Sequence, residues 1–365
     1  MSDIIVTASW RYHRAPSEYI NNPQSFEELK ENICGTFPRA LVWCSRFNDF
    51  PTPTQMSLVV SPLLWLSAIL NYVLSPIFRF TRLQTSLAPT RQNIYHLINK
   101  YRPTFFIVTP AVITSLLHRS NGETCDMTCL DLIMVGGSAV PKGLVEEVRE
   151  MVPGTEVVNA YGMTEMSMIA FHCDDPPTGS CGKRMGCLQY RIINTETNED
   201  ILEPHVSGEL WVRGPGVFKG YYNDPKSTER SFAEGGWFKT GDIFYRDENW
   251  NYYPVERIKS ILKYKSYQIA PVEIEGVIRQ LPGVFDVAVT GIPDEYGDDL
   301  PCACVIKRPG HNITAQEIKD LVKESLADVK HLSGGVIFLD ELPLTPSAKV
   351  NRKKLKEIVL EMDRL

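Results

Sequence analysis

A run of seven residues, Asn159-Ala-Tyr-Gly-Met-Thr-Glu165, combines side chains that could bind a nucleotide. We expect a strand before it and a tight turn at Gly162, where the missing side chain lets the backbone approach a ligand. The ring of Tyr161 offers a face for a flat base, the Thr164 hydroxyl could lie near phosphate, and Glu165 supplies a hard oxygen ligand for Mg²⁺. The alternative is a strand-to-loop turn in which the tyrosine and the threonine are simply packed.

A carboxylate and several cations follow later in the chain. Asp242 comes directly after a glycine in Trp237-Phe-Lys-Thr-Gly-Asp242, and a carboxylate in such a place can accept both hydroxyls of a ribose. An aspartate is also a common turn residue, so this alternative stays open. A short basic segment contains Arg257, Lys259, Lys263 and Lys265. A solvated charged surface is its ordinary explanation. Lys349 lies in a Pro/Ser loop between an expected strand and helix, where most lysines are only solvent-exposed.

Strands and helices alternate in the part of the chain that contains the heptapeptide. Apolar spacing predicts one helix over residues 93–102 and a second that begins near Pro141, a residue suited to a first helical position, and ends at Met151. Short apolar runs predict strands over residues 104–108, 130–135 and 156–158. This alternation is typical of an α/β protein with a parallel sheet, whose sites lie at the carboxyl ends of the strands.

The rest of the chain has a different pattern. Residues 182–253 contain short strands and turns, including a strand over 207–212, and predict a small β-subdomain attached to the sheet. The residues after Tyr253-Pro254 predict a separate α+β domain with a boundary near 256–259. Its expected helices cover residues 271–281, 314–326 and 353–362, and its strands 286–291, 301–306 and 335–339. Thr314 and Glu317 have the spacing of a capping box.

Length and composition narrow the class of protein. A chain of 365 residues exceeds what one hydrophobic core usually serves, so two domains are expected. The net charge of −6 argues against a nucleic-acid binder, which would need a basic surface. The nine cysteines are odd in number and no pair is spaced as CxxC, which favours free buried thiols over disulfides or zinc ligands.

One uncharged stretch, Ser57–Phe78, is long enough to cross a bilayer. Pro62 and Pro76 interrupt it, and two arginines follow closely. We therefore expect a buried strand, a turn and a core helix there instead of a transmembrane segment.

Four motifs, in this order and at these separations, resemble the adenylate-forming (AMP-binding) superfamily. They are YGMTE, GWFKTGD, ERIKSILKYKSYQIAPVEIE and TPSAKVNRKKL. The chain looks most similar to insect luciferase-like acyl-CoA ligases and plant 4-coumarate–CoA ligases, with the family's first subdomain missing. The resemblance implies an α/β fold in which residues 1–255 form a truncated N-terminal AMP-binding domain, with 1–55 divergent. A hinge at 256–259 and a smaller α+β C-terminal domain over 260–365 would follow.

The resemblance also implies which residues would contact the nucleotide. The loop lining the adenine and acyl pocket would consist of Gly136, Gly137 and Ser138. The heptapeptide residues implied to bind the nucleotide are Asn159, Tyr161, Gly162 and Met163. Tyr161 would stack on the adenine. Thr164 and Glu165 match the phosphate and Mg²⁺ contacts.

Six residues nearer the C-terminus also match functional positions of the family. Asp242 matches the ribose-binding aspartate, and Arg257 the neighbouring nucleotide-binding arginine. Lys259 falls at the hinge about which the C-terminal domain turns. Lys263 and Gln268 lie on the loop used when the thioester forms. Lys349 matches the lysine that contacts the α-phosphate and the substrate carboxylate during adenylation.

These roles imply an acid–thiol ligase that uses ATP, Mg²⁺ and CoA. A carboxylic acid, fatty or aryl, would form an acyl-adenylate and then acyl-CoA, with release of pyrophosphate and AMP. Cations would offset the negative charge that builds when a carboxylate attacks a phosphate, and a domain rotation would separate the two half-reactions. Relatives often end in a peroxisomal Ser-Lys-Leu tripeptide. This chain ends in Asp363-Arg-Leu365, so peroxisome and cytoplasm both stay open.

The sequence departs from the family pattern in several places. Residues 33–40 match the family's phosphate loop, but its run of small residues has shrunk to Gly35-Thr36, which leaves fewer N–H groups for the β- and γ-phosphates. Glu256 stands where aspartate is usual, and Ser266 and Ala348 replace glycines. Two alternatives to an active ligase therefore stay open. One is a catalytically impaired protein that only binds a nucleotide or acyl ligand, and the other is a truncated isoform of an active parent.

Overall fold

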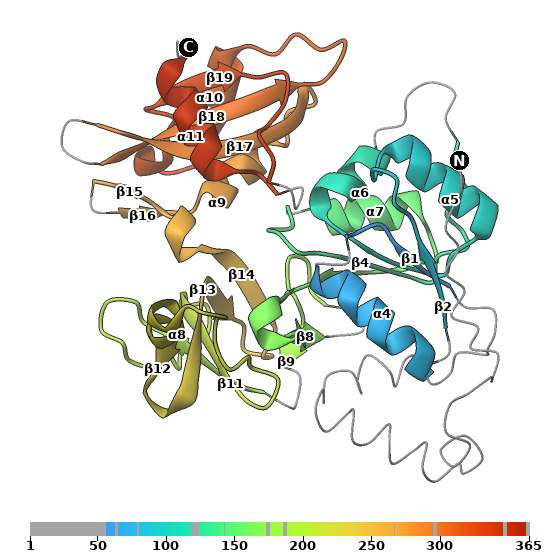
Figure 1. Ribbon diagram of the computed structural model, residues 1–365. Coiled ribbons are helices and arrows are strands. Elements are labelled where there is room, and N and C mark those ends of the chain that lie inside the picture. Colours follow the sequence, from blue (N-terminus) through green and yellow to red (C-terminus); the bar gives the residue numbers. More distant parts are fainter. Residues whose placement is uncertain are drawn as a thin grey trace, which may run out of the picture. The chain divides into compact units, whose positions relative to one another are not determined.

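The structure, a computed structural model, describes residues 56–362 apart from 63–64, 79, 118–123, 142, 173–175, 185–187, 266, 295–297 and 346–348. The chain divides into two compact units (Figure 1). The first unit takes in the described residues up to Thr240 together with Tyr245–Tyr253. The second unit consists of Gly241–Phe244 and the residues from Pro254 onward.

The first unit is built on a parallel sheet with the strand order β2-β1-β3-β4-β5. Its strands are β1 (Met56–Val59), β2 (Thr81–Gln84), β3 (Phe105–Val108), β4 (Leu132–Gly136) and β5 (Glu156–Ala160). The helices between successive strands are α4 (Leu66–Phe78), α5 (Arg91–Tyr101), α6 (Pro110–Leu117) and α7 (Leu144–Met151). The predicted α/β class with a parallel sheet is confirmed.

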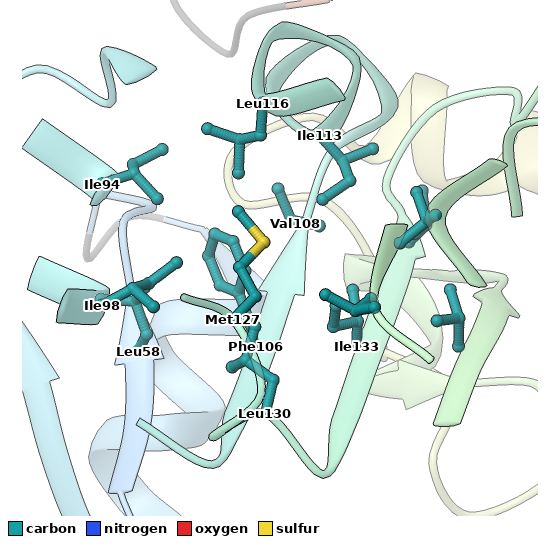
Figure 2. Packing of buried hydrophobic residues seen from close by; sticks show 14 of the residues in the cluster. Leu58, Ile94, Ile98, Phe106, Val108, Ile113, Leu116, Met127, Leu130 and Ile133 are labelled. Atoms are coloured by element: carbon teal, nitrogen blue, oxygen red, sulfur yellow. The ribbon is translucent and has the colours of Figure 1, made fainter. Parts of the chain in front are cut away.

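Helices cover both faces of this sheet because the side chains of each strand alternate. Leu58 on β1 joins the main hydrophobic core, to which α5, α6 and α7 contribute. Figure 2 shows labelled core side chains from these elements, among them Ile94, Phe106 and Ile133, gathered in one layer. The neighbouring Ser57 points to the other face, where its hydroxyl donates to Asn71 Oδ1 on α4 at 2.6 Å. Packing in this core holds the parallel strands in their order and so determines which strand ends are neighbours.

Two segments of the first unit, Ser57–Phe78 and the start of α7, test predictions made from the sequence. The stretch Ser57–Phe78 does form a buried strand and a helix, β1 and α4, as predicted. The helix predicted to begin near Pro141 begins three residues later, at Leu144, and ends at Met151 as predicted. Gly143 occupies the cap position with φ 85°, a left-handed conformation that ends the preceding turn and delays the helix. Among the described residues, no helix combines the length and the apolar character that a membrane crossing requires.

A second, antiparallel sheet follows within the chain, with the order β10-β11-β13-β12 and with β14 paired to β13. Its strands are β10 (Gln189–Ile193), β11 (Gly208–Arg213), β12 (Phe232–Ala233), β13 (Trp237–Arg246) and β14 (Tyr252–Arg257). The short helix α8 (Pro225–Ser231) precedes β12.

The second unit is an α+β structure around the sheet β17-β18-β19. Its strands are β17 (Val284–Pro293), β18 (Asp299–Lys307) and β19 (Gly335–Phe338), and its helices are α9 (Pro271–Ile278), α10 (Ala315–Ser325) and α11 (Arg352–Glu361). One face packs on α9 and α10, and the other packs on α11. The predicted capping box is present, since Thr314 accepts from the Glu317 N–H while Glu317 accepts from the Thr314 N–H.

Five cysteines lie among the described residues, and all five are free. Cys181, Cys302 and Cys304 are buried, whereas Cys125 and Cys129 are half-buried. Burial raises the pKa of the Cys129 thiol, which keeps it protonated and unreactive near neutral pH. The prediction of free thiols holds for these residues.

Candidate active site

The carboxyl ends of β4 and β5 bring together two segments predicted to line one pocket. Val135 pairs with Asn159, and Gly136 pairs with Ala160. Gly137 and Ser138 leave β4 at the same edge where Tyr161 leaves β5, because the two strands are parallel neighbours. Gly137 and Ser138 are exposed, whereas Asn159 is buried. The two predicted nucleotide-binding segments therefore lie side by side.

Gly136 shows why this edge needs a glycine. A Cβ atom built at this position would lie 2.2 Å from the carbonyl oxygen of Ala160. The next residue, Gly137, has φ 87°, a conformation that L-residues rarely adopt. The backbones of β4 and β5 thus approach more closely than any side chain would allow. Positions 136 and 137 at the end of β4 therefore carry no side chain.

The Tyr161 ring is half-buried and stacks against Phe171, with centroids 5.9 Å apart and an interplanar angle of 29°. Phe171 in turn stacks on Tyr252 at 4.6 Å. The Ala170 N–H donates to the Tyr161 carbonyl at 2.7 Å, which fixes the backbone below the ring. Tyr161 is therefore held in place by packing, as expected if the residue had only a structural role. A held ring with partial exposure is also what stacking on a base requires.

The predicted tight turn at Gly162 is wrong. Gly162 and Met163 form the strand β6, which pairs antiparallel with β7 (Met168–Ile169). The chain reverses further on, in the 3₁₀ turn Thr164–Met166, and Ser167 closes that turn with φ 64°. The hydrogen bonds of a hairpin outweighed the conformational freedom of the glycine. As a consequence, Thr164 and Glu165 lie at the tip of a hairpin.

The hairpin tip presents oxygen atoms of the kind that bind Mg²⁺. Thr164 is exposed and Glu165 is half-buried. The Tyr221 hydroxyl donates to Glu165 Oε1 at 3.0 Å, and the Phe218 N–H donates to the Glu165 carbonyl at 2.8 Å. A carboxylate and a hydroxyl are hard donors, so this pair fits a magnesium ion that keeps several water ligands.

In the second unit, Asp242 and Arg257 form an ion pair. Arg257 Nε lies 2.9 Å from Asp242 Oδ1, with the aspartate side chain 8% exposed and the arginine side chain 59% exposed. Asp242 belongs to strand β13 and follows Gly241, whose φ is 72°. The aspartate is therefore not an ordinary turn residue, and the alternative explanation for it is wrong. The ion pair with Arg257 orients this buried carboxylate.

The basic segment of the second unit is exposed, as expected for Arg257, Lys259 and Lys263. Lys259 lies in a 3₁₀ turn (Ile258–Ser260), and Lys263 lies on β15 (Leu262–Tyr264). The structure places Lys263 directly opposite Gln268 of β16 (Tyr267–Ile269). Two residues predicted to act at the same step are thus cross-strand neighbours. The N–H groups of Lys263 and Lys265 donate to Asp299 and Asp298, which holds this hairpin.

Lys349 lies half-buried in the loop before α11. Its N–H donates to Thr345 Oγ1 at 3.3 Å, and its carbonyl accepts from the Thr345 N–H at 2.7 Å. Leu344 and Val350 form an antiparallel bridge on either side. These two contacts hold the Lys349 backbone against Thr345.

Comparisons with known proteins show which family the chain is similar to. The model of the family described as AMP-binding enzyme matches residues 39–222, and that of the AMP-binding enzyme C-terminal domain matches residues 273–349. This chain belongs to the AMP-binding enzyme family. It is 34% identical to 4-coumarate–CoA ligase-like 6 of Oryza sativa subsp. japonica over 71% of the chain, and 36% identical to luciferin 4-monooxygenase of Nipponoluciola cruciata over 72%.

Solved structures support the same family assignment. The o-succinylbenzoate CoA synthetase of Bacillus subtilis in complex with its acyl-adenylate intermediate is 28% identical, with a TM-score of 0.73 over 88% of this chain and 64% of that one. The same enzyme with ATP and magnesium ion is 29% identical, also with a TM-score of 0.73 over 88% of this chain and 65% of that one. The chain spans only about half the length of the curated relatives named above, 44% and 48% respectively.

Several predictions for this family member lie outside the described residues. They include the phosphate loop at 33–40, Ser266, Ala348 and the C-terminal tripeptide. The domain boundaries and the individual roles of the site residues also stay predictions.

Two residues with evident contacts were not predicted from the sequence. Tyr221 contacts Glu165, and Arg352 forms ion pairs with Glu275 and Glu256. Tyr221 stands in Gly220-Tyr-Tyr-Asn-Asp224, a polar turn that could have been considered, whereas Arg352 looks like one cation among several.

Proposed function

We propose that this chain activates a carboxylic acid with ATP and transfers the acyl group to the thiol of CoA. In the first step a carboxylate oxygen attacks the α-phosphorus, and the bond from that phosphorus to the oxygen bridging to the β-phosphate breaks. Acyl-adenylate and pyrophosphate are the products. In the second step the thiol sulfur bonds to the acyl carbonyl carbon, the thiol proton is lost, and AMP leaves.

One observation carries this proposal: the close edge of β4 and β5, together with the Thr164–Glu165 tip in the same unit, offers a backbone surface, an aromatic ring and hard oxygens. Tyr161 would stack on the adenine, and Asp242 would accept the ribose hydroxyls. Glu165 and Thr164 would hold Mg²⁺, which when bound neutralises charge on the departing pyrophosphate. Relatives named as CoA ligases, and a neighbour bound to an acyl-adenylate, support the reaction class.

The lysines of the second unit would act at different steps. Lys349 would place its ammonium group near the α-phosphate and the substrate carboxylate, where two anions meet. Lys263 and Gln268 would serve thioester formation. Removing one preorganised charge of this kind typically costs about 3 kcal/mol of barrier, or roughly a hundredfold in rate.

The test is ATP–pyrophosphate exchange with a panel of fatty, cinnamic and benzoic acids. Exchange reports adenylation alone, so it does not depend on CoA. We expect Lys349→Ala to lower exchange roughly a hundredfold. Lys353→Ala removes the same charge from an exposed site four residues away and should leave exchange unchanged. Equal losses in both variants would contradict the role of Lys349.

A second candidate, a protein that binds nucleotide without turnover, is favoured by one observation. The phosphate loop at residues 33–40 contains fewer small residues than the family pattern requires. Under this alternative, calorimetry would detect AMP binding while exchange stays absent with every acid. Exchange with any one acid would exclude it.

A further inference from the structure

We infer that Tyr221 is a positioning residue, which orients the Glu165 carboxylate for the divalent cation that accompanies ATP. The inference rests on the proposed function for its reaction and deepens it at one residue. It concerns contacts that lie entirely within the first unit. Neither the reaction class nor the family membership assigns a role to Tyr221.

The loop that carries Tyr221 holds Glu165 at two points. The Tyr221 hydroxyl donates to Glu165 Oε1 at 3.0 Å, and the Phe218 N–H donates to the Glu165 carbonyl at 2.8 Å. The first contact fixes the carboxylate, and the second fixes the backbone from which it extends. Side-chain and backbone placement of Glu165 therefore both depend on this one loop, which lies more than fifty residues away in sequence.

The loop itself is tightly constrained, so it can serve as a fixed support. The Tyr221 N–H donates to Thr228 Oγ1 at 2.8 Å, and the same hydroxyl donates to the Asp224 carbonyl at 2.9 Å. Asp224 caps α8 by accepting from the Ser227 N–H at 2.9 Å. At Gly220 a Cβ atom would come within 2.6 Å of Thr228 Cγ2, so only glycine fits there.

Aromatic packing fixes the direction of the phenol as well. The rings of Phe218 and Tyr221 meet edge to face, with centroids 4.9 Å apart and an interplanar angle of 68°. Phe218 also contacts Phe232 and Phe238. A phenylalanine at position 221 would keep these contacts and lose only the hydroxyl.

A hydrogen bond from Tyr221 does not prevent cation binding by Glu165. An ionised carboxylate has about four lone-pair sites on two oxygens, and the phenol uses one of them. Partners that orient a metal-binding carboxylate typically change metal affinity or activity by about 10-fold to 100-fold when they are removed. We therefore expect loss of the Tyr221 hydroxyl to act on the cation requirement.

The neighbouring Tyr222 provides a matched control. It carries the same hydroxyl one residue away, and it is 93% exposed. Tyr221→Phe and Tyr222→Phe thus remove the same atom from a positioned and from a solvated ring.

The experiment uses the full chain and two measurements. The first is the Mg²⁺ concentration that gives half-maximal ATP–pyrophosphate exchange. We expect this concentration to rise roughly tenfold in Tyr221→Phe and to change less than about twofold in Tyr222→Phe. The second measurement is Mn²⁺ binding in the presence of ATP, followed by electron paramagnetic resonance, which needs no turnover. We expect the Mn²⁺ dissociation constants of the two variants to differ by the same ratio.

The two measurements separate failure of this inference from failure of the proposed reaction. If the wild-type chain shows no exchange, the proposed function fails, while the Mn²⁺ titration still tests Tyr221. Equal Mn²⁺ affinity in wild type and Tyr221→Phe would overturn the inference. Absence of ATP-dependent Mn²⁺ binding in the wild-type chain would overturn it too. A double variant supplies a further check, because the Tyr221 effect should disappear when Glu165 is already changed to Gln.

Discussion

Glu165 in the first unit and Lys349 in the second are held in place by different means. Glu165 lies at a hairpin tip, and an exposed loop supports it through one phenol and one N–H group. Lys349 lies three residues before Arg352, which forms ion pairs within the interior of the second unit. Surface hydrogen bonds hold Glu165, whereas a largely buried charge cluster anchors the start of α11, next to the loop that carries Lys349.

The charge cluster has three members on different elements. Arg352 begins α11, and its Nη1 donates to Glu275 Oε1 at 3.0 Å and to the Val289 carbonyl at 2.7 Å. Its Nη2 lies 3.9 Å from Glu256 Oε2. The Glu275 and Glu256 side chains are only 8% and 6% exposed. The cluster therefore connects the base of the Lys349 loop to the end of β14.

This difference predicts how far the effect of a substitution should extend beyond the substituted residue. Surface support can be removed with little effect on folding, because water replaces the lost partner. Removing one member of a buried ion pair leaves an uncompensated charge, which destabilises the surrounding unit. Changes at Tyr221 should therefore alter function at constant stability, whereas changes at Arg352 should alter both.

The largest expected effect comes from breaking the charge cluster with Arg352→Met. Leaving Glu275 buried without its partner should cost about 3–5 kcal/mol of unfolding free energy. The four described tryptophans, Trp65, Trp211, Trp237 and Trp250, all belong to the first unit, and the sequence of the second unit contains none. We therefore expect urea unfolding to shift when it is followed by far-UV circular dichroism, but not when it is followed by tryptophan fluorescence.

Lys353→Met is the control for this variant, since it places the same side chain at the next, exposed position of α11. It should leave both transitions unchanged. A loss below about 1 kcal/mol in Arg352→Met, the range of surface ion pairs, would show that the cluster does not support the second unit.

A smaller effect is expected in the first unit from Gly136→Ala. The new Cβ atom would meet the Ala160 carbonyl, so β4 and β5 must separate, at a cost of about 1–3 kcal/mol for overpacking. This loss should shift the tryptophan fluorescence transition. Gly276→Ala makes the same change inside α9 of the second unit, where no atom lies within 4 Å of the new Cβ, and should leave the circular dichroism transition unchanged. Equal urea midpoints for wild type and Gly136→Ala would contradict the close approach of β4 and β5 at this position.

The smallest effect concerns the pH dependence of the second unit. Burial raises the pKa of Glu256, with Arg352 opposing that shift and Glu275 reinforcing it. Because the pKa of Glu256 is higher in the folded state than in the unfolded state, the contribution of this residue to the unfolding free energy is fully present below about pH 4.5. It is lost as the pH rises through the pKa of the folded state. The glutamine side chain in Glu256→Gln stays neutral at every pH. The unfolding free energy of this variant, measured relative to the wild type, should therefore increase from pH 4.5 to pH 8.

Urea midpoints followed by circular dichroism across this pH range would measure the difference. Glu324→Gln, at an exposed site on α10, is the control and should follow the wild type. A constant difference between Glu256→Gln and wild type at every pH would rule out titration of Glu256.

The sequence predicted the elements of the site better than their supports. The apolar runs before Gly136 and Asn159 predicted two parallel strands, and parallel neighbours must end at the same edge. Tyr221 and Arg352 were not predicted, because the local sequence does not show partners that lie 56 and 77 residues away. The turn at Gly162 was predicted wrongly because strand pairing with Ile169 overrode glycine's local freedom.

The contact between Gly136 and the Ala160 carbonyl limits which residues this protein can accept at position 136. A library that varies this position and is sorted for folded protein should therefore be strongly enriched in glycine.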